Sequence, residues 1–145
     1  MAIISKKYDK LLAILLSWLG FSTILVSCVE YGAPPATYKA KGVVVSQTNN
    51  APIEGIRAVL KAEPNATQGI DTVYTNSKGV FKLKSINDYY YTFYVELTDV
   101  DGEKNGSFAN KEVEVDFSHV KFKGDDVTDR EVEKDLGIIK LTPKE

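Results

Sequence analysis

The cysteine at position 28 is the side chain with the clearest capacity for chemistry, and it is the only cysteine in the 145 residues. A thiolate is the best nucleophile among protein side chains and is readily alkylated or acylated. The apolar run 11–26 precedes Cys28 and itself follows Lys6, Lys7 and Lys10. The order of positive, apolar and then small residues is typical of an export signal.

The end of this segment resembles the lipobox of bacterial lipoprotein signals. Its four residues are Leu25, Val26, Ser27 and Cys28. The resemblance implies cleavage between Ser27 and Cys28, a diacylglycerol thioether on the Cys28 sulfur, and acylation of the new amino group by a fatty acid such as palmitate. A single acyl chain binds membranes only marginally, so two or more chains give a stable anchor. We therefore expect a membrane partner through lipid on Cys28.

Two other interpretations of residues 1–28 were weighed. An uncleaved membrane helix needs roughly 20 apolar residues, and this run is shorter and interrupted by small polar side chains. A buried helix of a cytosolic protein would show one apolar face, whereas this run is apolar on all sides. Lipidation of Cys28 is the expectation that we keep.

Catalysis has little support in the sequence. Hydrolysis needs a nucleophile, a base and a group that orients the base, and His119 is the only histidine. Zinc sites take several His or Cys ligands, and the chain has no Walker motif or glycine-rich phosphate loop. We expect no catalytic residue and no enzyme activity; an envelope hydrolase that uses His119 is an alternative.

One acidic segment could bind a metal. Four side chains with hard oxygen ligands alternate along it: Asp99, Asp101, Glu103 and Asn105. Calcium takes about 6–8 such oxygens. However, Lys104 stands where an EF-hand loop needs glycine, and Asn110 stands where it needs glutamate. A hairpin loop built on Asp-Gly and Asn-Gly turns explains the segment equally. We expect no cofactor, with calcium as the alternative.

Thr72 is a candidate for modification. Asp71-Thr72-Val73 resembles the O-glycosylation acceptor of Bacteroidota, in which Asp is followed by Ser or Thr and an apolar residue. The other interpretation is that Thr72 is simply a strand residue, favoured there by its β-branch. A glycosylated threonine has to face solvent.

Aromatic side chains are concentrated at residues 89–94, where five of six positions are Tyr or Phe. Alternation along a strand sends Tyr90 and Tyr94 to the face opposite Phe93. Tyrosine is enriched at interfaces, so these two could form a patch for a protein or a glycan. The alternative is a second buried face beneath the connection 118–135.

From Tyr38 onward, apolar and polar residues alternate with a period of two, and turn residues separate the runs. The expected strands are Tyr38–Val45, Ile56–Ala62, Asp71–Thr75, Val80–Leu83, Tyr89–Thr98, Lys111–Phe117 and Gly137–Leu141. Gly79 in the turn 76–79 suits a positive φ. Apart from one turn within Asp125–Lys134, no helix is expected after Cys28. The pattern predicts an all-β domain, a single antiparallel β-sandwich of about seven strands.

Size and charge limit the classes of partner. Cleavage after residue 27 leaves 118 residues, and removing three lysines and one aspartate leaves 15 basic and 19 acidic side chains, a net charge of −4. This is one ordinary domain without a disulfide. The charge argues against nucleic acid and against electrostatic docking on anionic lipid. The expected organisation is a signal over 1–27, a lipidated tether over 28–37 and the sandwich over 38–145.

Two stretches resemble carboxypeptidase regulatory-like domains, whose fold is a transthyretin-like (prealbumin-like) β-sandwich. One covers 41–45 and 51–60; the other covers 71–81, with Asn76 where that family often has Asp. With the lipobox and the tether, the whole chain resembles the radical SAM-associated lipoproteins of Bacteroidota. The resemblance implies an envelope lipoprotein encoded near a radical SAM enzyme. The chain has no cysteine cluster for an iron–sulfur centre of its own.

The function expected from these observations is a lipid-anchored β-sandwich that acts as a binding or assembly module in the cell envelope. Val29, rather than Asp, follows Cys28, so the inner-membrane retention signal of some Gram-negative bacteria is absent and the outer membrane is expected. The expected partner is an envelope protein or glycan. A calcium-stabilised structural module is the alternative from a different class.

Overall fold

The computed structural model describes residues 8–15, 35–87, 91–123 and 130–145. The chain divides into two compact units, Met1–Gly32 and Ala33–Glu145. In the first unit, residues 8–15 form a short helix. Among the described residues, no helix has the length and apolar character needed to cross a membrane. Four lipobox residues and two tyrosines of the aromatic run lie outside the described residues: Leu25, Val26, Ser27, Cys28, Tyr89 and Tyr90.

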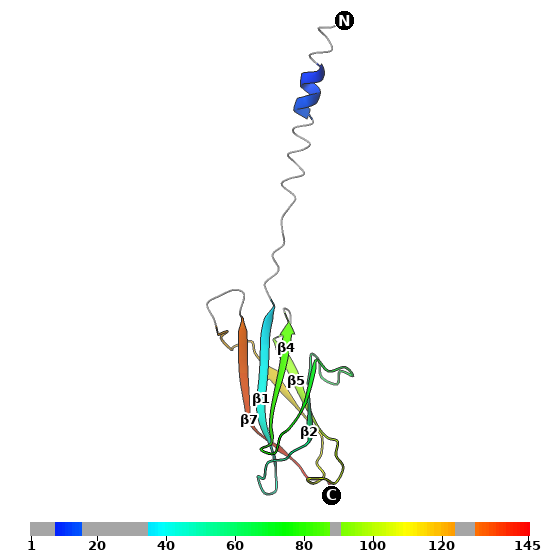
Figure 1. Ribbon diagram of the computed structural model, residues 1–145, viewed down its shortest axis with the longest axis vertical. Helices are drawn as coiled ribbons and strands as arrows, with labels where there is room; N and C mark the ends of the chain where they lie inside the picture. Colours follow the sequence, from blue (N-terminus) through cyan, green and yellow to red (C-terminus); the bar gives the residue numbers. More distant parts are fainter. Residues whose placement is uncertain (1–7, 16–34, 88–90, 124–129) are drawn as a thin grey trace. The chain divides into compact units, whose positions relative to one another are not determined.

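The second unit is a β-sandwich of two sheets (Figure 1). Its strands are β1 (Ala36–Ser46), β2 (Ile56–Lys61), β3 (Asp71–Tyr74), β4 (Val80–Asn87), β5 (Thr92–Asp99), β6 (Lys111–Asp116) and β7 (Glu131–Leu141). One sheet has the order β4-β1-β7 and the other has the order β3-β2-β5-β6. The predicted all-β sandwich of about seven strands is confirmed.

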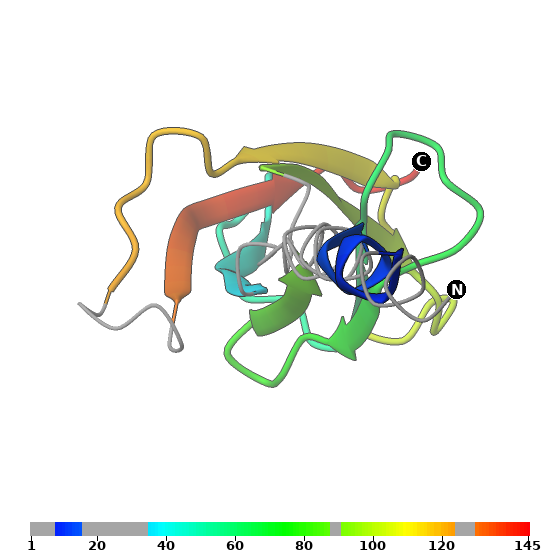
Figure 2. The same ribbon diagram turned by 90° about the horizontal axis from the view of Figure 1, so that it is seen from above.

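The direction of the last strand differs from the prediction. Strand β7 pairs with β1 in parallel, while every other strand pair is antiparallel. Residues 117–123, the described part of the chain that follows β6, project to one side of the sandwich (Figure 2). Strand β7 begins at the end of the sandwich where β1 begins, so the two strands run in the same direction. Strand β1 is therefore the central strand of its sheet, hydrogen-bonded on both sides.

Strand β7 also begins six residues earlier than predicted. The segment Glu131–Leu136 carries mostly charged side chains, which hide its alternation. In the structure, Val132 is buried, while Glu131 and Glu133 pair with lysines of β1 on the outer face. A helical turn was expected within Asp125–Lys134. Of these residues the structure describes 130–134, and residues 131–134 belong to strand β7. A register shift between β1 and β7 occurs beside Gly137, whose φ is 67°.

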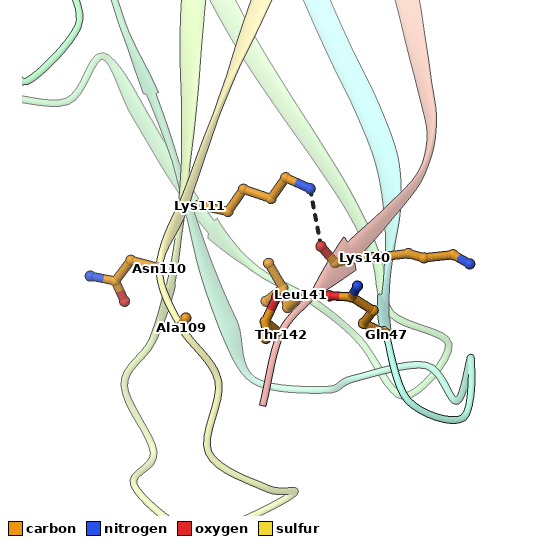
Figure 3. Close-up of a pocket in the computed structure, with 7 residues that line it drawn as sticks. All are labelled: Gln47, Ala109, Asn110, Lys111, Lys140, Leu141 and Thr142. Carbon is orange, nitrogen blue, oxygen red and sulfur yellow. Dashed lines mark hydrogen bonds between the residues drawn. The ribbon is translucent and has the colours of Figure 1, made fainter. Parts of the chain in front are cut away.

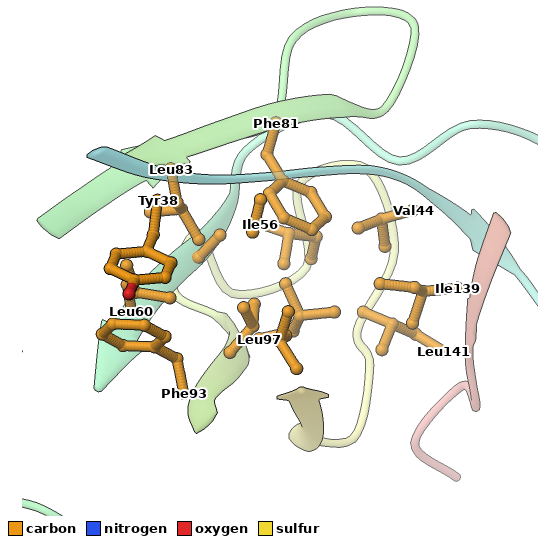
Figure 4. Close-up of a cluster of buried hydrophobic side chains, with 14 of the residues drawn as sticks. Tyr38, Val44, Ile56, Leu60, Phe81, Leu83, Phe93, Leu97, Ile139 and Leu141 are labelled. Carbon is orange, nitrogen blue, oxygen red and sulfur yellow. The ribbon is translucent and has the colours of Figure 1, made fainter. Parts of the chain in front are cut away.

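The core lies between the sheets and follows the predicted alternation (Figure 4). Phe93, Val95 and Leu97 of β5 are fully buried, and Tyr38 lies among four aromatic rings, two of them close. Its ring centroid lies 5.3 Å from that of Phe93 and 5.2 Å from that of Phe117. Tilted and edge-on pairs at such distances are the favoured aromatic geometry. Tyr91 precedes the strand and is half exposed, and its ring centroid lies 6.5 Å from that of Tyr38.

The turn between β3 and β4 forms as predicted. The Asn76 side-chain oxygen accepts hydrogen bonds from the backbone N–H groups of Lys78 and Val80, each at 3.0 Å. Gly79 has a φ of 71°, and a Cβ at this position would lie 2.3 Å from the carbonyl oxygen of Val44. Glycine is therefore required both for the backbone conformation and for the close approach of β1.

Candidate functional site: a polar loop cluster at one end of the sandwich

The two ends of the sandwich differ in what they contain. Strand β1 enters at Ala36, beside the end of β4 and the start of β7; we call this end the proximal pole. The connections 47–55, 75–79 and 100–110 and the C-terminal residues 142–145 lie at the opposite end (Figure 1). We call these four segments the distal loop cluster.

Hydrogen bonds tie the segments of the distal loop cluster to one another. The N–H of Ala109 donates to the carbonyl of Thr142, and the N–H of Lys144 donates to the carbonyl of Ser107, each at 2.8 Å. The Thr75 hydroxyl donates to the carbonyl of Ile53 at 2.7 Å. The C-terminal residues therefore act as a short extra strand that pairs antiparallel with the 107–109 segment.

A groove of about 320 Å³ opens beside this extra strand (Figure 3). Its lining residues are Gln47, Ala109, Asn110, Lys111, Lys140, Leu141 and Thr142. The Thr142 hydroxyl donates to the Gln47 side-chain oxygen at 2.8 Å, and the Lys111 ammonium donates to the carbonyl of Lys140 at 3.1 Å. In Figure 3 the Asn110 amide and the Lys140 ammonium point to opposite sides, away from these bonds. Both groups are exposed and can therefore bind a ligand that approaches from solvent.

A second groove, of about 410 Å³, lies on the other side of the extra strand. It is lined by residues from 46–53, 105–108 and 143–144. Ligand sites for small molecules have similar volumes but are mostly enclosed and apolar. These two grooves are open, and their lining combines amide, hydroxyl and lysine side chains with apolar ones. Such a surface is suited to hydrogen bonding with a sugar or a peptide.

The acidic segment predicted as a calcium alternative forms part of this cluster. One Asp99 oxygen accepts from the N–H of Phe108 at 2.8 Å, and the other accepts from the N–H of Asp101 at 3.4 Å. Asp101 accepts from the Asn105 amide at 3.3 Å. Glu103 is exposed, and in the described residues no group of three or more His, Cys, Asp or Glu is placed to hold a metal ion. The carboxylates of Asp99 and Asp101 close a hairpin loop here.

Residues 116–119 contain Asp, Ser and His together, at the proximal pole. The N–H and the hydroxyl of Ser118 donate to the Asp116 carboxylate at 2.8 Å and 2.9 Å, and these bonds lower the pKa of Asp116. His119 is exposed. In a hydrolytic triad the histidine bridges serine and aspartate. Here the serine hydroxyl bonds directly to the carboxylate, so this arrangement does not prepare Ser118 for deprotonation by His119.

Thr72 and Tyr94 share the outer face of the four-stranded sheet. Thr72 pairs with Val59 of β2, and Tyr94 pairs with Lys61 two residues further along that strand. Thr72 is exposed, as an acceptor of a sugar has to be, and Tyr94 is half-buried. The structure therefore brings these two sequence candidates to one face, with β2 between them.

An ion pair on this same face was not among the candidates that the sequence suggested. The Lys61 ammonium lies 2.5 Å from a Glu96 oxygen, and the Lys61 side chain is only 8% exposed. The hydrogen bond from Lys61 is the main reason that the pKa of Glu96 is lowered. The alternation of each strand does place its charged residue, Lys61 in β2 and Glu96 in β5, on the outward side. The pairing of β2 with β5, which makes them neighbours, was not predictable from either run alone.

The comparisons with known proteins extend to the fold alone. No family model and no curated protein sequence matches the chain. Among solved structures, the 5-hydroxyisourate hydrolase of Klebsiella pneumoniae is 13% identical, with a TM-score of 0.46 over 76% of this chain and 92% of that chain. The major plantain pollen allergen is 17% identical, with a TM-score of 0.44 over 75% and 95%. The 3-chlorocatechol 1,2-dioxygenase of Rhodococcus opacus is 10% identical, with a TM-score of 0.48 over 79% and 62%.

The strand order of the two sheets defines the class. Three strands in the order β4-β1-β7, with β7 parallel to β1, face four strands in the order β3-β2-β5-β6. The class is a seven-stranded β-sandwich of a three-stranded and a four-stranded sheet, and the transthyretin-like topology remains what the sequence resemblance implies.

Proposed function

We propose that this chain is a lipid-anchored β-sandwich of the bacterial cell envelope, held in the outer membrane by acyl chains on Cys28. It acts as a binding or assembly module, has no catalytic activity of its own, and uses the distal loop cluster as its contact surface. The expected partner is an envelope protein or glycan.

The observation that carries this proposal is the position of the distal loop cluster relative to the start of β1. Seven residues separate Cys28 from β1, a tether that extends to at most about 28 Å. Strand β1 then runs for 11 residues, about 35 Å, to the loops. Attachment and contact surface thus lie at opposite ends of the strands, so that one does not obstruct the other.

The chemistry of the grooves supports binding in preference to catalysis. Asn110 and Lys140 offer an amide and an ammonium to solvent, while Thr142 and Gln47 are already bonded to each other. These groups are hydrogen-bond donors and acceptors with no acid–base pair among them. The Asp-Ser-His group at 116–119 is at the other pole.

The anchor is tested by intact-mass analysis of protein purified from native membranes, beside the Cys28→Ala variant. We expect a chain that begins at Cys28 and carries acyl mass, and we expect the variant to lose both features and to leave the membrane fraction. An unmodified chain that begins at Met1 would refute the anchor.

The contact surface is tested by photo-crosslinking in native membranes. A photoreactive amino acid is placed at Asn110 or Asn49 in the distal loop cluster, or at Glu114 on β6 as an exposed control. We expect one discrete adduct, shared by the two loop positions and absent at Glu114. Adducts from Glu114 alone would place the contact surface elsewhere.

A further inference from the structure

The outer face of the three-stranded sheet carries four lysines on two adjacent strands. Lys39 and Lys41 of β1 stand directly opposite Lys84 and Lys82 of β4. We call these four residues the lysine quartet. Like charges that face each other across strands destabilise a sheet, so the chain carries two unfavourable pairs side by side. Such a cost is offset when an anion binds between the strands.

Two members of the quartet have acidic partners on β7. Lys39 lies 2.7 Å from Glu131, and Lys41 lies 2.7 Å from Glu133 and 3.9 Å from Asp135. The hydrogen bond to Glu133 raises the pKa of Lys41, which keeps this lysine charged. The acids of β7 are thus occupied by the lysines of β1.

The other two members, Lys82 and Lys84, are exposed and have no ion pair within 4 Å among the described residues. The nearby Asp71 uses one carboxylate oxygen to accept the backbone N–H of Lys84 at 2.8 Å. Strand β4 therefore carries a local positive charge, which the net charge of the whole chain, the basis for expecting no electrostatic docking on anionic lipid, does not reveal.

The quartet surrounds a shallow depression of about 220 Å³, completed by Ala40, Leu83 and Glu133. Lysine ammonium groups bind phosphate as point charges, and their long stems can reach toward a surface in front of the sheet. At the proximal end of the same face, Ile86 pairs with Thr37 and is 63% exposed. An apolar side chain beside a lysine cluster fits the boundary between lipid headgroups and acyl chains.

We infer that this face docks on the phosphate headgroups of anionic lipids in the bilayer that holds the chain. The inference rests on the lipid anchor of the proposed function. Lys39 and Lys41 lie about 10 Å and 17 Å along β1 from its first residue, which is less than the length of the tether. The anchor keeps the face close to the headgroups, and the lysines determine which face turns toward them.

Docking in this orientation has a consequence for the rest of the domain. The four-stranded sheet, with Thr72 and Tyr94 on its outer face, is turned away from the bilayer. The distal loop cluster stays open at one end of the domain. The contact surface of the proposed function therefore remains accessible.

The test uses the full lipidated chain in vesicles of phosphatidylcholine alone, or of phosphatidylcholine with about one-third phosphatidylglycerol. An amine-acylating reagent is applied, and the rate at each lysine is measured by mass spectrometry. We expect Lys82 and Lys84 to react at least about fivefold more slowly on the anionic vesicles, with the difference lost at high salt. Lys104 and Lys144, in the distal loop cluster, should react at equal rates. If each of the four lysines reacted at the same rate on the anionic vesicles as on the neutral ones, the inference would be overturned.

Two charge-matched variants sharpen the test. In the unmutated chain, Lys39 and Lys41 should also be acylated more slowly on the anionic vesicles, and Lys82→Glu with Lys84→Glu should abolish this difference. Lys104→Glu with Lys144→Glu makes the same change of charge in the distal loop cluster and should preserve it. Loss of protection in both variants would show a non-specific effect of net charge and would contradict the assignment of this face.

Intact mass, measured first, separates failure of the anchor from failure of the docking. If the chain carries no lipid, its free Cys28 thiol is coupled to a maleimide lipid in the same vesicles, and the acylation rates are measured as before. Slower reaction of Lys82 and Lys84 would then support the docking without the natural anchor. Equal rates on a lipidated chain would leave the anchor standing and refute the docking.

Discussion

Lys61 and Glu96 show how one ion pair is held on an otherwise solvated face. Burial of an ammonium is costly unless a carboxylate compensates it, and the Lys61 side chain is 8% exposed while that of Glu96 is 29% exposed. Val59, the outward residue between Arg57 and Lys61 on β2, is also buried. The pair therefore lies in a partly covered environment, where loss of one partner matters more than at an open surface.

Replacement Glu96→Gln tests this pair. We expect the free energy of unfolding to fall by about 2 kcal/mol at neutral pH, because the Lys61 charge is left buried without its counter-charge. Chemical denaturation of the two proteins measures the difference. Glu114→Gln, an exposed position on β6, should change the stability by less than about 0.5 kcal/mol.

The same pair predicts a pH dependence. The pKa of Glu96 is lower in the folded chain than its ordinary value, so its contribution to stability is present above about pH 4.3 and disappears as the pH falls through the lowered value. The stability gap between the wild-type chain and Glu96→Gln should thus be constant from about pH 5 to 8 and close below about pH 4. A gap that persists at low pH would show that packing, and not charge, is responsible.

Among the elements, the turn between β3 and β4, which carries the chain from one sheet to the other, depends on one glycine. Gly79 and Gly102 have the same φ of 71°, but they differ in their surroundings. A Cβ at Gly79 meets the backbone of Val44, whereas a Cβ at Gly102 has nothing within 4 Å. The two positions therefore separate the strain of a left-handed conformation from the strain of a steric clash.

Replacement of each glycine by Ala should give unequal losses of stability. Gly102→Ala should cost about 1 kcal/mol, the strain of a positive φ alone. Gly79→Ala should cost about 3 kcal/mol or more, because β1 and the turn between β3 and β4 must also move apart. Denaturation midpoints measure both values, and equal losses would contradict the steric explanation.

The elements also show what the sequence could predict. The turn at 76–79 and strands β5 and β6 were identified because their alternation and their turn residues are local signals. The first half of β7 was missed because Glu131, Glu133 and Asp135 are charged, and their partners Lys39 and Lys41 lie more than 90 residues earlier in the chain. A parallel strand has the same period of two as an antiparallel one, so the direction of β7 was not encoded locally.

In the whole molecule, one core joins the two sheets, and we expect the described sandwich to unfold in a single transition. A ligand of the native state would raise the midpoint of this transition by mass action. Because both Asp99 oxygens accept backbone N–H groups, we expect millimolar calcium to shift the melting temperature by less than about 1 °C.

Asp99→Asn provides the matched variant for this test. It should lower the stability by about 1–2 kcal/mol whether calcium is present or not, because a backbone N–H loses a charged acceptor. If calcium raised the melting temperature of the wild-type chain but not that of Asp99→Asn, the acidic segment would be a metal site. Differential scanning calorimetry with calcium and with a chelator distinguishes the two outcomes.

Some candidate sites consist of consecutive residues, whereas others are formed by residues that lie far apart in the sequence. The acidic segment and Thr72 were visible as short patterns, and the structure places each in a hairpin loop or on an exposed strand face. The grooves beside the C-terminal residues were not visible, because Gln47, Lys111 and Thr142 come from three separate parts of the sequence. The lysine quartet could be recognised only once the register between β1 and β4 was known.

The central place of β1 has a mechanical consequence. A force on the proposed anchor is applied to the domain at Ala36. If a bound partner holds the distal loop cluster, this force acts along the strands. The hydrogen bonds of β1 to β4 and to β7 lie across that direction on both sides of the strand, so they share the load and must break together. Loaded in shear in this way, β1 resists extraction far better than an edge strand that peels away one bond at a time.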